Sequence, residues 1–201
     1  MRPAPFCLLI ALLPLGQQPA DPLAARTKGN PKAPVVVYEM ADFQCPACRE
    51  FALTTLPTLD RDFVQSGKVR WVFVNFPLTS IHKNAVAAAQ VAMCAARQNR
   101  FWPVHDLLYR HQPEWAPLDN PDSALLKLAD SAGVKHDSLA ACVSSHATVE
   151  AIQQDAQGSV RAGANATPSF YVEGGLASGA IPAPVFSHIL DSIYSAKTAS
   201  H

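Results

Sequence analysis

Two cysteines separated by two residues stand where a strand-like pattern gives way to a helix-like one, and this junction constrains the fold more than any other feature. The β-branched and aromatic run Val35 to Tyr38 predicts a buried strand. Cys45-Pro46-Ala47-Cys48 follows, and apolar residues then recur at roughly helical spacing from Arg49 to about Ser66. Pro57 predicts a kink in this helix and Gly67 predicts its end. The dithiol is therefore expected in the first turn of a helix that follows a strand.

The segments that follow extend this pattern. Val69 to Phe76 is the clearest strand of the sequence, and the order strand, helix, strand predicts a parallel pair with a right-handed crossover. Residues from 84 to about 162 are rich in helix formers and predict an all-α segment. Ser169 to Val172 predicts another strand, and a last helix is expected from about Pro184 to Ala196. An α/β fold interrupted by an all-α segment follows from this order.

The composition indicates a buried core and a nearly neutral surface. Hydrophobic residues make up 49% of the 201 residues and charged residues 16%, so a sizeable core can form. The 16 Lys and Arg residues balance the 16 Asp and Glu residues, and the two signs are interspersed. Nucleic acids and anionic membranes attract proteins with a positive patch or a net positive charge. No nucleic acid is therefore expected as a partner.

The N-terminus differs from the rest of the chain. An apolar stretch from Phe6 to Leu15 follows Arg2; it is too short to span a bilayer and fits the apolar core of a secretory signal. Residues 1–20 are therefore predicted to be a signal peptide, with an uncleaved anchor as the alternative, and residues 21–34 a polar lead-in segment. The predicted location is the periplasm or the cell envelope. Loss of Cys7 with the signal leaves an even number of cysteines, which favours disulfides in an oxidising compartment.

A dithiol with this spacing has three chemistries. A zinc site needs a second pair of ligands, but the sequence has no second Cys-x-x-Cys and its histidines are scattered, so no metal is expected. A structural crosslink across so short a loop would restrain little of the unfolded chain. A redox centre fits best, because the N–H groups and the dipole at a helix start stabilise a thiolate and lower the pKa of Cys45. Cys48, one turn further on, is placed to attack a mixed disulfide.

Three stretches of the sequence together resemble the DsbA-like thiol–disulfide oxidoreductases, a thioredoxin-fold family with an inserted helical domain. In chain order they are GNPKAPVVVYEMADFQCPACREF, VNFPLTSIHKNAVAAAQVAMCAARQNRFWPVHDLLYRHQ and ATPSFYVEGG. The resemblance covers most of residues 29 to 198. It implies an α/β thioredoxin-like fold, a mixed central sheet flanked by helices. The sheet would come from residues 35–80 and 164–198, with the all-α insertion at residues 81–163.

The resemblance also implies roles for the dithiol residues. Cys45 matches the nucleophile of the family and Cys48 its resolving cysteine, which makes the Cys45–Cys48 disulfide the redox group and leaves no need for a cofactor. Pro46 and Ala47 form the intervening dipeptide. The strongest oxidases of the family have a histidine in this dipeptide, where it stabilises the thiolate. Its absence here leaves the redox potential open.

Residues on both sides of the dithiol match its supporting groups. Thr167-Pro168 directly precedes a predicted strand and matches a cis-proline dipeptide whose backbone holds the substrate segment; a trans proline that leads into a strand is the alternative. Glu39 matches an acid beneath the active site that helps to move protons, against the alternative of a solvated carboxylate at a strand edge. Asp42 is expected to shape the turn before the dithiol. The run Gly163 to Ala166 has fewer glycines than the family pattern, so this loop is less permissive.

Two further cysteines lie in the predicted insertion. Cys94 and Cys142 each fall on the apolar side of a predicted helix. Export and the even cysteine count favour a structural disulfide between them over two buried thiols. A bridge across such a long loop would add about 4 kcal/mol to stability on the chain-entropy model.

The histidines and tryptophans of the insertion have simpler interpretations. His82, His105 and His111 are expected on helices in packing or surface roles. Trp102 and Trp115 are expected in the core or between the two parts of the fold, with a hydrophobic rim around the dithiol as the alternative.

These features lead to one functional hypothesis and two alternatives. The sequence predicts an exported, monomeric dithiol oxidase that forms disulfides in reduced or unfolded exported proteins through a mixed disulfide at Cys45. The resemblance implies a quinone-linked membrane reoxidase as a second partner. A reductase or isomerase with the opposite electron flow is the first alternative. A client-binding or chaperone module with a structural Cys-x-x-Cys is the second.

Overall fold

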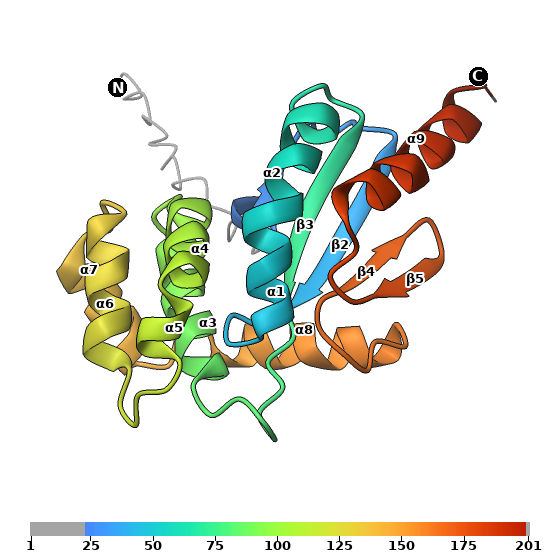
Figure 1. Ribbon diagram of the computed structural model, residues 1–201. Coiled ribbons are helices and arrows are strands. Elements are labelled where there is room, and N and C mark those ends of the chain that lie inside the picture. Colours follow the sequence, from blue (N-terminus) through green and yellow to red (C-terminus); the bar gives the residue numbers. More distant parts are fainter. Residues whose placement is uncertain (1–22, 200–201) are drawn as a thin grey trace, which may run out of the picture.

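A five-stranded mixed sheet and an inserted group of helices make up the protein (Figure 1). The computed structural model describes residues 23–199. The strand order in the sheet is β1-β3-β2-β4-β5, and the helices of the insertion follow β3 in the chain. Figure 1 shows α3 to α7 gathered to the left of the sheet, away from the β4–β5 hairpin. The predicted α/β thioredoxin-like fold with an all-α insertion is therefore confirmed.

The centre of the sheet is the predicted parallel pair. β2 (Val35–Ala41) and β3 (Val69–Asn75) run parallel and pair residue for residue along their whole length. β4 (Ser169–Val172) pairs antiparallel with β2, and β5 (Gly175–Ser178) pairs antiparallel with β4. The side chains of β2 and β3 are almost all buried, as expected for central strands covered on both faces.

The crossover helix between β2 and β3 begins at the dithiol and runs in four segments. These are α1 (Pro46–Glu50), η2 (Phe51–Thr55), α2 (Leu56–Leu59) and η3 (Asp60–Val64). η2 and η3 are π-helical turns, in which an N–H group bonds the carbonyl five residues earlier. η2 ends just before Pro57, which has no N–H group to donate. The irregularity predicted at Pro57 thus takes the form of π turns.

The predicted lead-in segment already belongs to the fold. Its residues form η1 (Ala24–Arg26), a 3-10 turn, and β1 (Thr27–Lys28), which pairs antiparallel with β3. Arg26 is buried, and its guanidinium group donates to the carbonyl of Phe73 and forms an ion pair with Asp155. A strand of two residues has no periodicity of its own, so only its pairing with β3 reveals it.

The helical insertion lies between β3 and β4. Its helices are α3 (Ala85–Ala96), α4 (Phe101–Arg110), α5 (Gln112–Trp115), α6 (Asp122–Ser131), α7 (His136–Ser144) and α8 (Val149–Arg161). α8 leads back to the sheet and packs against β3, where Asp155 accepts a hydrogen bond from the side chain of Asn75 at 2.7 Å. The last helix, α9 (Ala183–Ala199), packs against α2 and β2. The two faces of the sheet are thereby covered by different helices.

Two large apolar clusters form most of the core. One lies between the sheet and the helices α2 and α9 and contains Trp71. The other fills the insertion and contains Trp115 together with Cys45 and Cys48. Trp102 packs against both clusters. The core and interface interpretation of Trp115 and Trp102 is therefore confirmed, whereas a rim role is wrong for Trp115, which is fully buried.

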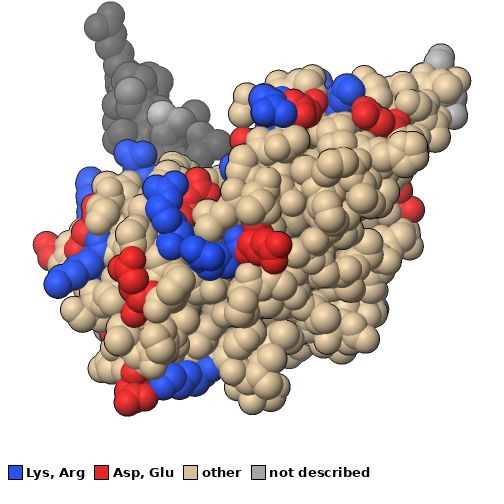
Figure 2. Space-filling view, in the orientation of Figure 1, with Lys and Arg blue, Asp and Glu red and all other residues tan. Residues whose placement is uncertain are grey.

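The surface carries mixed charges. Figure 2 shows positive and negative side chains in small mixed clusters, and a broad uncharged area across the lower middle of this face, over the start of α1 and the loop before α3. Within residues 23–199, no helix is both long enough and apolar enough to cross a membrane. The predicted signal peptide, residues 1–20, lies outside the described residues.

Candidate active site

The dithiol lies at the junction that the sequence predicts. Cys45 is the N-cap of α1 with an extended backbone (φ −72°, ψ 124°), and Pro46 is in the first turn of the helix. Both cysteines are free thiols. The side chain of Cys45 is 7% exposed and that of Cys48 is fully buried, while Pro46 is exposed and Ala47 half-buried. An attacking group can therefore reach Cys45 but not Cys48.

The two thiols differ strongly in acidity. A hydrogen bond from the Cys48 thiol lowers the pKa of Cys45 most, to about 6, helped by Thr167 and by the N–H groups of Ala47 and Cys48, although burial acts against this. Burial raises the pKa of Cys48 well above its ordinary range, and its contact with Cys45 adds to the effect. The lowered pKa of Cys45 has the predicted direction, but the hydrogen bond from Cys48 contributes more to it than the N–H groups at the helix start. Near neutral pH the pair therefore holds one proton, on Cys48.

The Thr167-Pro168 dipeptide lies against this pair, although it is far away in the sequence. The Thr167–Pro168 peptide bond is cis. Both residues are buried, and the Cys45 thiol lies 3.3 Å from the carbonyl oxygen of Thr167. The Thr167 hydroxyl has no hydrogen-bond partner within residues 23–199. The residues predicted to support the dithiol from this side are therefore next to it.

Asp42 holds the turn before the dithiol. One carboxylate oxygen accepts a hydrogen bond from the N–H of Gln44 at 2.7 Å, and the backbone carbonyl accepts one from the N–H of Cys45 at 3.1 Å. The other carboxylate oxygen accepts from the N–H of Leu78 and lies 2.8 Å from His82 Nδ1. The predicted turn role is confirmed, and Asp42 also fixes the loop before α3. His82 lies in this loop, so its predicted helical position is wrong.

Polar side chains of the insertion hold the same turn from the other side. Gln112 of α5 donates to the carbonyls of Phe43 at 2.7 Å and of Cys45 at 3.0 Å. Gln44 donates to the carbonyl of Ala116 and accepts from the N–H of Asn84. Neither glutamine was predicted as a site residue. A buried glutamine on a helix looks like any surface glutamine until its distant partners are known.

The other histidines of the insertion have structural roles. His105 of α4 is fully buried among aromatic rings, including Trp102 at 4.9 Å between ring centroids, and burial lowers its pKa. His111 joins α4 to α5 and lies 2.8 Å from a carboxylate oxygen of Glu114. The predicted packing role of His105 is confirmed, and nothing places either ring beside the dithiol.

Glu39 lies inside the protein. Its side chain on β2 is fully buried, so the alternative of a solvated carboxylate is wrong. Trp71 Nε1 on β3 donates a hydrogen bond to Glu39 Oε2 at 2.7 Å. Burial raises the pKa of Glu39 to about 7, although the Trp71 hydrogen bond and the charge of Lys28 act in the opposite direction. The carboxyl group can therefore gain or lose a proton near neutral pH.

The other two cysteines within residues 23–199 form a disulfide. Cys94 on α3 is bonded to Cys142 on α7, with 5.8 Å between their Cα atoms. Cys94 is buried and Cys142 is half-buried in the core of the insertion. The bridge ties α3 to α7, as the sequence predicts.

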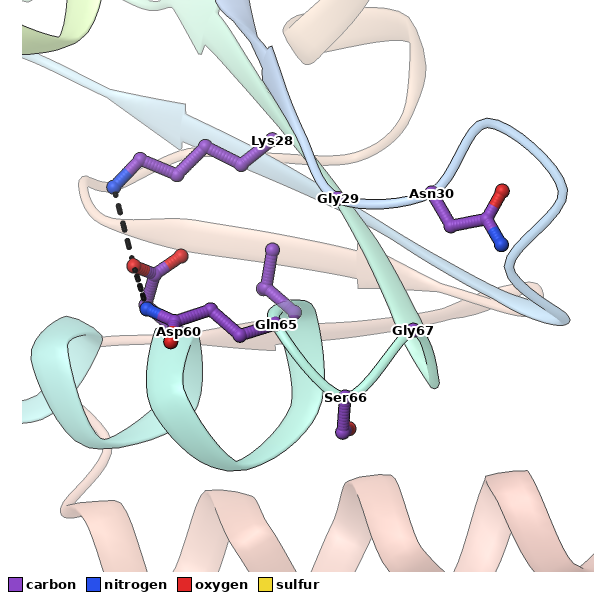
Figure 3. Close-up of a pocket in the computed structure, with 8 residues that line it drawn as sticks. Lys28, Gly29, Asn30, Asp60, Gln65, Ser66 and Gly67 are labelled. Carbon is purple, nitrogen blue, oxygen red and sulfur yellow. Dashed lines mark hydrogen bonds and ion pairs between the residues drawn. The ribbon is translucent and has the colours of Figure 1, made fainter.

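A surface pocket elsewhere does not overlap the dithiol. Figure 3 shows its walls, the loop from Lys28 to Asn30 and the segment from Asp60 to Gly67. Its polar groups bond one another: Lys28 Nζ lies 3.7 Å from Asp60 Oδ2, which also accepts from Gln65 at 3.2 Å. No group of three His, Cys, Asp or Glu side chains that could hold a metal ion occurs in the part of the chain that the structure describes.

Comparison with known proteins identifies the family. The profile of the family described as Thioredoxin matches residues 23–192. The probable disulfide bond formation protein D of Bacillus anthracis is 33% identical over 157 residues, which are 75% of this chain and 70% of that protein. The Na⁺/H⁺ antiporter NhaA 3 of Salinispora tropica is 35% identical over 156 residues, but this chain spans only 22% of its length.

Solved structures share the fold. BdbD from Bacillus subtilis superposes with a TM-score of 0.76 at 23% identity, over 85% of this chain and 92% of that one. The Wolbachia pipientis protein alpha-DsbA1 superposes with a TM-score of 0.78 at 20% identity, over 87% and 93% of the two chains. The profile match, the relatives and the shared helical insertion agree. The chain therefore belongs to the thioredoxin family and, within it, to the DsbA-like thiol–disulfide oxidoreductases.

Proposed function

We propose that this chain is an exported protein-disulfide oxidase that donates its Cys45–Cys48 disulfide to reduced proteins. The observation that carries the proposal is the difference between the two thiols. The pKa of Cys45 is lowered to about 6, so the reduced form gains a stable thiolate. Stabilisation of the reduced form makes the disulfide a stronger oxidant. Electrons would therefore flow from substrate to enzyme.

The reaction consists of two exchanges. A substrate thiolate attacks Cys45 Sγ, because Cys45 is the cysteine within reach. The bond between the two cysteines breaks, and its electron pair goes to Cys48. A second substrate thiolate then attacks the substrate sulfur of the mixed disulfide and releases Cys45 as a thiolate. The substrate loses two electrons and gains a disulfide, and the enzyme is left as the dithiol.

Glu39 is proposed to supply the proton that the first exchange needs. The Cys48 thiolate that leaves is unstable, because burial raises the pKa of Cys48 well above its ordinary range. Glu39 is buried, and its charge and that of Cys48 both act on the pKa of Tyr109. The pKa of Glu39 is raised to about 7, so it can give up a proton near neutral pH. Transfer of this proton makes Cys48 a thiol and leaves Glu39 as a carboxylate.

The surface around the dithiol suits unfolded protein substrates. The start of α1 lies in the uncharged area of Figure 2, together with the loop before α3. This loop exposes 70% of Ile81, a large apolar side chain, and such side chains attract partners with exposed apolar segments. The names of the Bacillus relatives, disulfide bond formation protein D, support the same substrates. Ion transport is not proposed, because the match covers 22% of the antiporter.

The proposal includes a location and a second partner. Residues 1–20 direct export, or remain as an anchor, and place the protein in the periplasm or cell envelope. The Cys45–Cys48 dithiol is then reoxidised by a quinone-linked membrane protein, as the family resemblance implies. The protein acts as a monomer without a cofactor.

The test is disulfide transfer to a reduced, unfolded protein. The oxidised enzyme should convert substrate thiols to disulfides in stoichiometric amounts, whereas Cys48→Ser, which cannot form the Cys45–Cys48 disulfide, should convert none. If the enzyme instead rapidly reduces oxidised substrate and leaves reduced substrate untouched, the reductase alternative is correct. Unchanged client binding by Cys45→Ser, with no thiol exchange in the wild type, would identify a chaperone module.

A further inference from the structure

The three tryptophans of the protein differ in what their indole N–H groups bind. Trp71 Nε1 donates to a carboxylate oxygen of Glu39 at 2.7 Å. Trp115 Nε1 donates to the backbone carbonyl of Leu108 at 2.8 Å. Trp102 Nε1 is buried without a hydrogen-bond partner in the described part of the chain. Trp71 is therefore the one of the three whose N–H group contacts a titratable group.

Strand register places Trp71 beside Glu39. Trp71 pairs with Lys28 of β1 on one side and with Val37 of β2 on the other. Side chains alternate along a strand, so Val37 and Glu39 point to the same face of the sheet as Trp71. The Trp71 ring is fully buried and stacks on Phe51 at 6.0 Å between centroids. The ring is thus held firmly by its neighbours, and its N–H group has a fixed direction.

The two oxygens of the Glu39 carboxyl group have different surroundings. Oε2 accepts the Trp71 hydrogen bond. Oε1 is buried and has no partner within residues 23–199. An oxygen that accepts an N–H bond is a poor place for a proton, whereas an unpartnered oxygen can carry one and present it as a donor. When Glu39 is protonated, the proton therefore sits on Oε1.

We propose that Trp71 is the positioning residue of Glu39: its indole N–H group holds Oε2, so that Oε1 carries the proton that moves to and from the dithiol. The transfer of this proton to the dithiol rests on the proposed function. The positioning of Glu39 by Trp71 does not. The charged or titratable groups around the site are Lys28 from β1, Tyr109 from α4, Cys45 and Cys48 at the start of α1, and Asp42 from the turn before it. In the described residues, the hydrogen bond to the Glu39 carboxyl group comes from Trp71 and not from any of these groups.

The contact has a predictable electrostatic effect. A hydrogen bond donated to a carboxylate favours the charged form and lowers the pKa of the acid. Removal of the Trp71 N–H group therefore raises the pKa of Glu39, while burial keeps acting in the same upward direction. A hydrogen bond to a charged group is worth enough to move the titration of Glu39 upward by about one pH unit.

The experiment compares three Trp→Phe variants, each of which keeps an aromatic ring. The pKa of Glu39 is measured in the reduced protein by NMR of its side-chain carboxyl carbon. We expect Trp71→Phe to move the midpoint upward by about one pH unit. Two variants are matched controls: Trp102→Phe loses an N–H group without a partner in the described residues, and Trp115→Phe loses one that is bonded to a backbone carbonyl. Both should leave the midpoint of Glu39 unchanged. Equal midpoints in all three variants would overturn the assignment.

A measurement on the unaltered protein keeps the test independent of folding. The indole N–H resonance of Trp71 should titrate with the midpoint of Glu39, about 7, and this titration should disappear in Glu39→Gln. A Trp71 resonance that does not respond to pH in this range would also overturn the assignment. The pH profile of disulfide exchange is recorded in parallel. If Trp71→Phe moves the Glu39 midpoint but not the rate profile, the positioning by Trp71 stands and the proton role of Glu39 fails.

Discussion

The Cys45–Cys48 and Cys94–Cys142 pairs show how surroundings decide what two thiols do. In the first pair, at the start of a helix, Cys45 is slightly exposed and Cys48 is fully buried, and both are free thiols. The second pair is a disulfide that joins two helices across a sequence separation of 48 residues, with Cys94 buried and Cys142 half-buried. In the first pair a hydrogen bond from Cys48, helped by N–H groups at the helix start, stabilises the Cys45 thiolate, whereas the two sulfurs of the second pair are joined and do not titrate. The first pair is therefore suited to exchange and the second to a permanent crosslink.

The difference also separates stability from reactivity. A crosslink restrains the unfolded chain more as its loop grows, so the Cys94–Cys142 bond contributes stability that the dithiol cannot. Thiol exchange needs a thiolate, which the lowered pKa of Cys45 provides, whereas Cys94 and Cys142 are joined in a disulfide and have no free thiol. Substitution of Cys94 and Cys142 should therefore leave disulfide exchange unchanged. Substitution of Cys45 should leave the stability contributed by the Cys94–Cys142 bond unchanged.

The largest effect is expected for substitution of Cys45, the cysteine of the dithiol that is not fully buried. Cys45→Ser should abolish disulfide exchange with a reduced protein, because no other described thiol is both acidic and accessible. The Cys94→Ala/Cys142→Ala double variant is the control and should exchange at close to the wild-type rate, measured below its unfolding temperature. Exchange that persists in Cys45→Ser would mean that the second pair is also a redox centre.

The next largest effect is the loss of protein stability when the Cys94–Cys142 disulfide is removed. The Cys94→Ala/Cys142→Ala variant should lose about 4 kcal/mol of unfolding free energy, the chain-entropy value for a loop of 48 residues. Denaturant unfolding of the two proteins, both with the dithiol alkylated, measures this difference. A loss much smaller than this, or an altered reduction potential of Cys45–Cys48, would contradict the separation of the two roles.

Glu39 provides a smaller, pH-dependent effect near the first pair. The folded pKa is raised from 4.5 to about 7, so the contribution of Glu39 to stability is present below pH 4.5 and is lost as the pH rises through 7. Between these values the unfolding free energy of the wild type should fall relative to Glu39→Gln, by about 3 kcal/mol in total. Unfolding curves at several pH values test this. A constant difference between the two proteins would mean that Glu39 titrates normally.

The smallest expected effect is a change in the pKa of Cys45 when Cys48 is replaced. A hydrogen bond from Cys48 is the largest cause of the lowered Cys45 pKa, so Cys48→Ala should raise the pKa of Cys45 above 6. Cys48→Ser, which keeps a donor, should raise it less. The pH dependence of Cys45 alkylation measures both. Equal values in the two variants would show that the N–H groups at the start of the helix act alone.

Local patterns predicted the features that depend on neighbouring residues. The strand before Cys45, the helix start at Pro46 and the Cys94–Cys142 bridge follow from apolar runs, capping preferences and cysteine counting. Glu39 could be singled out only through the family resemblance, because its burial depends on neighbouring strands. The local sequence pattern was therefore enough to predict the two reacting cysteines, but not the buried acid near them.

Contacts between distant segments could not be predicted in this way. The Trp71–Glu39 hydrogen bond depends on the register of two strands, and Gln112 reaches the dithiol turn only after the insertion has folded back on α1. β1 is two residues long and exists because β3 offers an edge. The loop that holds His82 is ordered by Asp42 rather than by helix propensity. Each of these features depends on contacts between residues that are far apart in the chain. The spacing of apolar residues along the sequence does not reveal such contacts.

The reduction potential of Cys45–Cys48 tests the account most directly. The protein would be equilibrated in glutathione buffers, with the alkylation of Cys45, Cys48, Cys94 and Cys142 followed by mass spectrometry. We expect a potential towards the strongly oxidising value of about −120 mV known for DsbA, with Cys94–Cys142 oxidised throughout. A potential near the value of about −270 mV known for thioredoxin would contradict the proposed direction of electron flow and identify a reductase.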